Sequence, residues 1–152
     1  MATPSTIAQN KKALFDYEVL ETFEAGIILN GGEVKSARAG GINLKGSHVS
    51  LASGRPILLA AHISPYKGET RGLAYGPTRD RELLLKHKDI VRLTQKIKEK
   101  GLTLVPTEFY FKGTLIKVKV ALVRGRAAHD KRNVLKNRTL EKEARVAMRA
   151  SI

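Results

Sequence analysis

The segment RGRAAHDKR (124–132) holds the residue pair of this sequence best suited to acid–base chemistry, His129 followed by Asp130. A histidine oriented by a carboxylate can act as a general base. Adjacent side chains on an exposed arm rarely face each other, however, and no apolar neighbours would exclude water from this pair. A solvated polar tail and an arm that contacts RNA are the two other interpretations of the segment.

Other kinds of reactive site find little support in the sequence. The four histidines show no spacing typical of metal ligands, and there is no cysteine. The glycines of LNGGEVKS (29–36) lack the spacing of a phosphate-binding loop and predict a tight turn instead. We therefore expect no catalytic residues, no metal and no cofactor, and a protein that is not an enzyme.

The charge of the chain indicates a polyanionic partner. Lys and Arg number 28 against 14 Asp and Glu, which gives a net charge of +14. Nucleic acid is the commonest partner of such proteins. A membrane is the rival, but the longest apolar stretch, ILLAA (57–61), is too short to span a bilayer. The N-terminus has no apolar segment typical of a signal peptide, so we expect a cytoplasmic location.

The spacing of apolar residues predicts a mainly β fold with some α-helix. We expect a small oligonucleotide-binding-like antiparallel β-barrel of about six strands with about three helices. It would form one RNA-binding domain over residues 10–123, after a flexible N-terminus at residues 1–9 and before a basic tail at 124–152. The expected elements are a strand in 15–29, a short helical turn in 32–40, a hairpin in 48–63 and a helix from Thr78 to Gly101. Two strands, LTLVP (102–106) and TEFYF (107–111), and a last strand in 114–123 follow.

Three residues on the expected strands could contact RNA. Lys117 and Lys119 alternate with apolar residues, which places them on the open face of a half-buried strand. They could contact phosphates or serve only solubility. Glu24 could accept hydrogen bonds from the amino group of a base, or it could form a surface ion pair.

The tail is more basic than the rest of the chain. Residues 124–152 contain nine Lys and Arg against three Asp and Glu. On a helix over 131–149, five basic residues would fall within roughly one 60° sector, opposite a thin apolar stripe that includes Leu140. Isolated helices of this length are marginal in water. We therefore expect the tail to be disordered when free and to fold on an anionic surface.

Five ordered blocks resemble one known family. They are NKKALFDYEVLETFEAGIILNGGEVKSARAG (10–40), HISPY (62–66), GPTRDRELLLKHKDI (76–90), KVKVALVRGRAAHDKR (117–132) and LKNR (135–138). Together they are similar to the SsrA-binding protein (SmpB) family over about residues 10–149. The resemblance implies an RNA-binding protein that binds the tRNA-like domain of transfer-messenger RNA (tmRNA, SsrA) and delivers it to stalled ribosomes for trans-translation. A general single-stranded nucleic-acid-binding barrel is the alternative.

The resemblance also implies partners and site residues. The tail would occupy the decoding centre and the mRNA channel of the small ribosomal subunit, and elongation factor Tu would accompany the charged RNA. Glu24, Leu84 and Lys117 match RNA-contacting positions, and we add Lys119 from the strand pattern. Basic support is expected from Lys11, Lys12, Lys35 and Arg38. The expected ribosome-binding tail residues are Gly125, His129, Asp130, Lys131, Arg132, Lys136, Arg138, Lys142, Arg145 and Arg149.

Three positions depart from the family pattern. Gly76 stands where the family usually has Asp before Pro, so the turn into the expected helix would lack an acidic cap. Leu140 stands where many members have Trp, which would remove a stacking contact with ribosomal RNA. His48 stands where Tyr is common, and we expect no effect from it.

Overall fold

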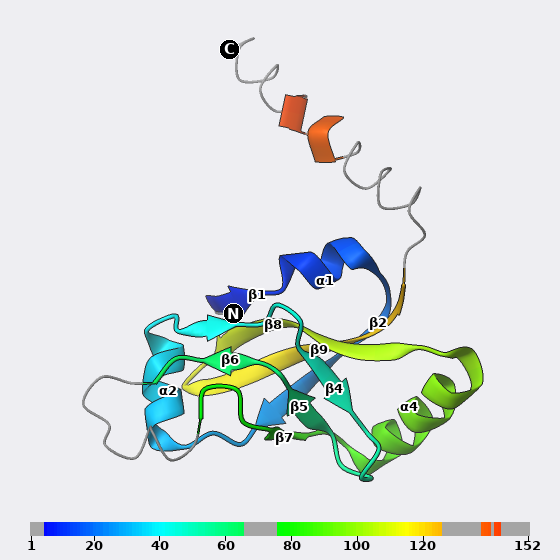
Figure 1. Ribbon diagram of the computed structural model, residues 1–152, viewed down its shortest axis with the longest axis horizontal. Coiled ribbons are helices and arrows are strands. Elements are labelled where there is room, and N and C mark those ends of the chain that lie inside the picture. The colour runs from blue at the N-terminus through cyan, green and yellow to red at the C-terminus, as the bar shows by residue number, and fades with distance from the viewer. Residues whose placement is uncertain (1–4, 66–75, 126–137, 141, 144–152) are drawn as a thin grey trace.

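The computed structural model describes residues 5–65, 76–125, 138–140 and 142–143, and it consists mostly of strands with a few helices (Figure 1). The strands are β1 (Ser5–Gln9), β2 (Tyr17–Ile27), β3 (Ile42–Asn43), β4 (His48–Ser50), β5 (Ile57–Leu59), β6 (His62–Ile63), β7 (Arg81–Leu84), β8 (Thr103–Lys112) and β9 (Leu115–Gly125). The helices are α1 (Lys11–Asp16), α2 (Gly31–Arg38) and α4 (His87–Lys100). The predicted fold class is confirmed.

Six of the strands close into a ring through antiparallel pairings. The order around the ring is β8, β4, β5, β7, β2 and β9, and β9 pairs again with β8. β1 joins the outer edge of β8, beyond the point where β4 pairs with it. The short strands β3 and β6 pair separately. In Figure 1, α2 and α4 lie at opposite ends of the ring.

The core fills the inside of this ring. Alternate residues of β9 point inward because successive side chains of a strand face opposite ways. Leu93 of α4 completes the packing at one end, and Gly101 ends this helix in the left-handed conformation (φ 62°), as the sequence predicts. The side chains of the core that are almost completely buried include Leu44, Leu58, Leu83, Leu93, Leu104, Phe109, Val118, Val120 and Leu122.

Helix α1 covers part of the outside of the ring. Its Ala13 packs against Val105 of β8 and against Ala121 and Val123 of β9, which form a second, smaller cluster. Asn10 fixes the start of the helix, since its side chain accepts from the Ala13 N–H (3.2 Å). The outer face of β8 and β9 is therefore apolar beneath α1 and polar beyond it.

A buried ion cluster ties α2 to the start of β7. The Arg81 side chain is fully buried and donates to Glu33 (Nε–Oε2, 2.6 Å) and to the carbonyl of Ala61 (2.7 Å). Arg79 also binds Glu33. Glu33 accepts from the Asn30 N–H while Asn30 accepts from the Glu33 N–H, which forms a capping box at the start of α2. No sequence pattern predicts this cluster, because Glu33 and Arg81 lie 48 residues apart.

Several predicted boundaries are wrong. Residues 5–9 of the expected flexible N-terminus form β1, because β8 extends beyond β4 and offers a free edge, and Ile7 packs against the core. The helix begins at His87 and not at Thr78, since residues 81–84 complete the ring as β7 between β5 and β2. The two strands expected in 102–111 are one strand, β8, with a bulge near Pro106.

The expected boundary between domain and tail at 123/124 falls inside a strand. β9 continues to Gly125, which pairs with Tyr17 of β2. Arg124 pairs with Glu18, and their side chains form an ion pair (2.5 Å). Gly125, which we assigned to the tail, is therefore part of the sheet.

Candidate nucleic-acid interface

The ring aligns distant residues in one row on its outer face. Gly26 of β2 pairs with Leu84 of β7 on one side and with Lys117 of β9 on the other. Lys117 pairs in turn with Tyr110 of β8, and Tyr110 pairs with Thr6 of β1. Because residues in register on neighbouring strands share a face, Leu84 and Lys117 flank a strip that Gly26 leaves without a side chain.

Leu84 is an apolar residue of the ring that faces solvent. Its residue surface is 57% exposed, although Leu83 beside it is buried. A Cβ added at Gly26 would lie 3.2 Å from Leu84 Cβ and Cδ1, so the glycine allows this leucine to lie close against β2. The outcome is a small exposed apolar surface next to a lysine, which suits contact with a base or a ribose.

A second row, of charged residues, lies two residues further along each strand and therefore on the same face. Glu24 of β2 pairs with Lys119 of β9, which pairs with Glu108 of β8. The Lys119 Nζ lies 3.7 Å from Glu108 Oε2. The structure thus brings Glu24, Leu84, Lys117 and Lys119 onto the same face, although the sequence separates them widely.

Glu24 is held on both carboxylate oxygens. Tyr110 donates its hydroxyl to Oε2 (2.6 Å), and Lys112 Nζ lies 3.0 Å from Oε1. The Tyr110 hydrogen bond, followed by the hydrogen bond from Lys112 and the nearby positive charges of Lys112 and Lys117, lowers the pKa of Glu24. The surface ion pair that we considered for Glu24 is present. Each carboxylate oxygen still has acceptor capacity for a further donor.

A recess of about 240 Å³ opens between the two rows. It is lined by Glu24, Glu108, Tyr110 and Lys119. Burial of the Tyr110 phenol and its hydrogen bond to Glu24 raise its pKa far above the ordinary value, so it stays protonated and remains a donor. A recess of this kind, with oriented acceptors and a flanking ammonium group, fits the polar edge of a nucleobase.

Sequence reasoning missed three residues of this face, namely Glu108, Tyr110 and Lys112. They alternate with Phe109 and Phe111 in the stretch TEFYFK (107–112). The period of two would have placed them on the outer face beside Lys117 and Lys119. The pattern does not predict the register of β2, β9 and β8, and this register places Tyr110 and Lys112 against Glu24.

The remaining predicted cations lie on two helices beside the sheet. Lys11 and Lys12 are exposed on α1, where Lys12 forms an ion pair with Asp16 (3.1 Å). Lys35 and Arg38 are exposed in the last turn of α2, which follows the end of β2. None of these four residues belongs to either row.

Most tail residues expected to bind the ribosome lie outside the described residues, namely His129, Asp130, Lys131, Arg132, Lys136, Arg145 and Arg149. Arg138 and Lys142 are described, and both are helical and exposed. Leu140 lies between them and is 52% exposed. The helix over 131–149 was expected only on an anionic surface, so this local conformation does not test that prediction.

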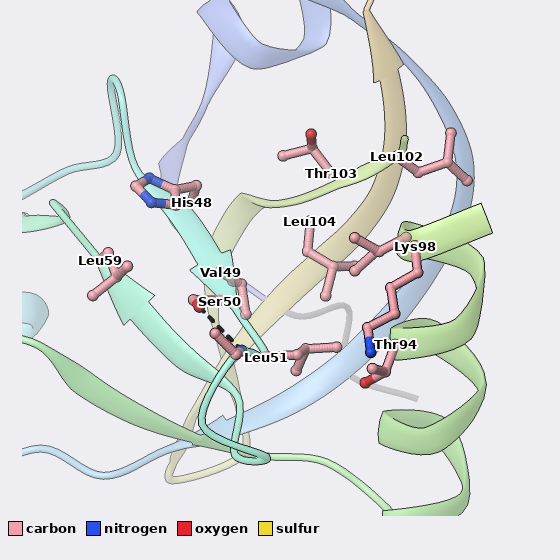
Figure 2. A pocket seen from close by; sticks show the side chains of 12 residues that line it. His48, Val49, Ser50, Leu51, Leu59, Thr94, Lys98, Leu102, Thr103 and Leu104 are labelled. Atoms are coloured by element: carbon pink, nitrogen blue, oxygen red, sulfur yellow. Dashed lines mark hydrogen bonds between the residues drawn. The ribbon is translucent and has the colours of Figure 1, made fainter. Parts of the chain in front are cut away.

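A larger recess of about 360 Å³ lies between α4 and the strands β4 and β8 (Figure 2). Its walls are mainly apolar and include Leu51, Leu102 and Leu104, with His48 on the β4 side and Lys98 on the α4 side. None of the predicted RNA-contacting residues lines it. The recess thus has few polar groups for the recognition of a nucleotide.

The structure also bears on the cap expected near Gly76 and on a possible membrane span. Gly76 adopts φ 68°, a left-handed conformation that glycine takes without strain. The expected loss of a helix cap at this position is wrong, because the turn leads into β7 rather than a helix. No helix among the described residues is both long and apolar enough to cross a membrane.

The fold and the two rows on its outer face together define a small basic β protein with an open surface that suits RNA. The family model described as "SmpB protein" matches residues 7–150. The chain belongs to the SmpB family.

Curated relatives and a solved structure agree with this assignment. An SsrA-binding protein of Gloeothece citriformis is 46% identical over 94% of this chain and 92% of the relative. The SsrA-binding protein of a Sulfurihydrogenibium species is 44% identical over 96% and 95% of the two chains. A solved chain, from a structure described as "tmRNA-SmpB: a journey to the center of the bacterial ribosome", matches with a TM-score of 0.63 and 42% identity, over 80% of this chain and 85% of that one.

Proposed function

We propose that this protein binds tmRNA and delivers it to stalled ribosomes for trans-translation. The observation that carries the proposal is the row in which Leu84, Gly26 and Lys117 lie side by side, next to Glu24 on the same open face. Membership of the SmpB family supports it independently. The net charge of +14 adds a long-range attraction for RNA.

The groups on this face divide into two kinds of contact. Lys117 and Lys119 bind phosphates and set the position of the RNA. Leu84 offers an apolar surface to a ribose or a base, and Glu24 accepts from a base edge. Lys11, Lys12, Lys35 and Arg38 strengthen the field around the face and make binding dependent on salt.

The tail supplies the second half of the function. Residues 126–152 enter the decoding centre and the empty mRNA channel, where ribosomal RNA receives their positive charge. His129 stacks on a base or forms a hydrogen bond with one, and it does not act as a general base. Elongation factor Tu accompanies the charged RNA. The protein acts by binding rather than by catalysis, and in the cytoplasm, where ribosomes work.

Competition between two RNAs tests the proposal. The full chain is titrated with the tRNA-like domain of tmRNA and with an unstructured RNA of equal length, at the same moderate salt concentration. We expect at least tenfold tighter binding of the tRNA-like domain, since discrimination requires contacts beyond the charge that both RNAs share. Equal affinities would support the alternative, a general single-strand-binding protein.

A further inference from the structure

We propose that the recess between Glu24, Glu108, Tyr110 and Lys119 binds the Watson–Crick edge of an unpaired guanine of the RNA. This inference rests on the proposed function and names the base that the face recognises.

The recess presents one carboxylate in a fixed orientation. Tyr110 and Lys112 each occupy one oxygen of Glu24, at 2.6 Å and 3.0 Å, and so restrict its rotation. A carboxylate has about four acceptor positions, so about two stay open. With its side chain 39% exposed, Glu24 can use them for a ligand from solution. Glu108 has other partners, because it accepts from Thr6 Oγ1 (2.5 Å) and faces Lys119.

Guanine is the base whose donors match this acceptor. Its N1–H and its N2 amino group lie side by side, and a single carboxylate can accept from both. Adenine and cytosine each place a ring acceptor next to the amino group, and uracil places its N–H between two carbonyl oxygens. A carboxylate would repel these acceptors, because both partners carry negative charge on the facing atoms. The Lys119 ammonium has three donors, so it can bind a phosphate and also donate to O6 of the same guanine.

The surroundings of the recess suit the rest of a nucleotide. Leu84 packs over Gly26 beside Lys117, one row away from Glu24 and Lys119. A ribose can pack on the exposed side chain of Leu84, and Lys117 can reach the phosphate. A base already extruded from a helix costs less to bind, so a guanine in a loop is the expected ligand.

Inosine substitution tests the inference. Each loop guanosine of the tRNA-like domain is replaced in turn by inosine, which lacks the N2 amino group and keeps the rest of the edge. The dissociation constants are measured for the full chain and for Glu24→Gln. We expect one substitution to weaken binding to the unchanged protein about tenfold. Glu24→Gln should weaken binding similarly, and the same inosine should then have little further effect.

Tyr110→Phe is the second variant. It keeps Glu24 and removes the hydroxyl that orients it, so we expect a smaller loss of affinity and a reduced effect of the critical inosine. Melting curves establish that each variant is folded. If Glu24→Gln does not fold, the inosine scan on the unchanged protein decides the question.

Two results would overturn the inference. One is a set of inosine substitutions that all leave the affinity unchanged. The other is a critical inosine whose effect adds fully to that of Glu24→Gln, because the two groups would then act independently. Both can occur while the tRNA-like domain is still bound more tightly than unstructured RNA, so the inference can fail without the proposed function.

Discussion

Glu24 and Lys117 carry opposite charges on one surface, and this allows specific contact to be separated from general attraction. Charge alone makes every lysine favourable for RNA binding and every glutamate unfavourable. Direct contact makes both residues favourable. Variants of these two positions, compared with variants of the same charge elsewhere, therefore distinguish the two contributions.

Lys117→Glu should weaken binding of the tRNA-like domain by more than about 1 kcal/mol, because the change removes an attraction and adds a repulsion of phosphate. Lys98→Glu, on α4 beside the apolar recess, changes the net charge equally and serves as the control. RNA titrations at moderate salt measure both. Equal losses in the two variants would argue against a contact at Lys117.

Glu24→Ala should reduce RNA affinity even though it makes the protein more positive. The expected loss is about 1–3 kcal/mol if the carboxylate accepts from a base edge. Glu99→Ala on α4 makes the same change of charge at an exposed position and should leave the affinity equal or slightly higher. Tighter binding by Glu24→Ala in the same titration would leave Glu24 only its contacts with Tyr110 and Lys112.

Glu33 governs stability rather than binding. Burial raises the pKa of its carboxyl, but hydrogen bonds from Arg79, the Asn30 N–H and Arg81 outweigh burial, and the pKa falls below 4.5. A lowered folded pKa gives stability that is complete above the unfolded value and is lost as pH falls through the folded value. Glu33→Gln should therefore cost about 3–5 kcal/mol at pH 7, since it leaves two arginines without their carboxylate.

Denaturant unfolding at pH 7 and at values below 4.5 measures this effect, and the difference between the two proteins should shrink as the pH falls. Glu82→Gln is the control, because its ion pair with Arg55 is long (3.8 Å) and exposed, and its loss should cost less than about 1 kcal/mol. A Glu33→Gln protein as stable as the control variant would contradict the role of the buried cluster.

At the scale of elements, the sequence predicted those strands and helix ends that depend on neighbouring residues alone. The alternation in 114–123 identified β9, and Gly101 identified the end of α4. The sequence failed where pairing partners decide the structure. Leu83 fits a heptad with Ile90 and Ile97, yet it lies on a strand because the ring needs β7 between β5 and β2. Leu84 was identified by family resemblance alone, and Lys117 and Glu24 also by their residue type and strand position. Tyr110 and Lys112 required the register.

β1 offers a test at this scale. Deletion of residues 1–9 should lower the free energy of unfolding by about 2–3 kcal/mol, mainly through the lost packing of Ile7 and the exposed edge of β8. Denaturant unfolding of the shortened chain measures the loss. Unchanged stability would favour the flexible N-terminus that the composition suggested.

At the scale of the whole molecule, the ring and the tail should have separable functions. A chain that ends after Gly125 keeps the pairs of Arg124 and Gly125 with β2, so its stability should be unchanged. It should still bind the tRNA-like domain, with a loss that shrinks as salt screens the missing tail charges. Peptide tagging on ribosomes stalled without a stop codon should fail. Normal tagging by this chain would mean that the tail is a solvated arm without a role.

The length of β9 has a consequence for how two large partners share this small protein. Lys117 lies near one end of the strand and Gly125 at the other, and a strand rises about 3.4 Å per residue, so about 27 Å separates them. The sheet on both sides makes β9 a stiff spacer between the bound RNA and the root of the tail. Both partners can therefore be held at once without competing for surface, and the contact with one raises the local concentration of the protein for the other.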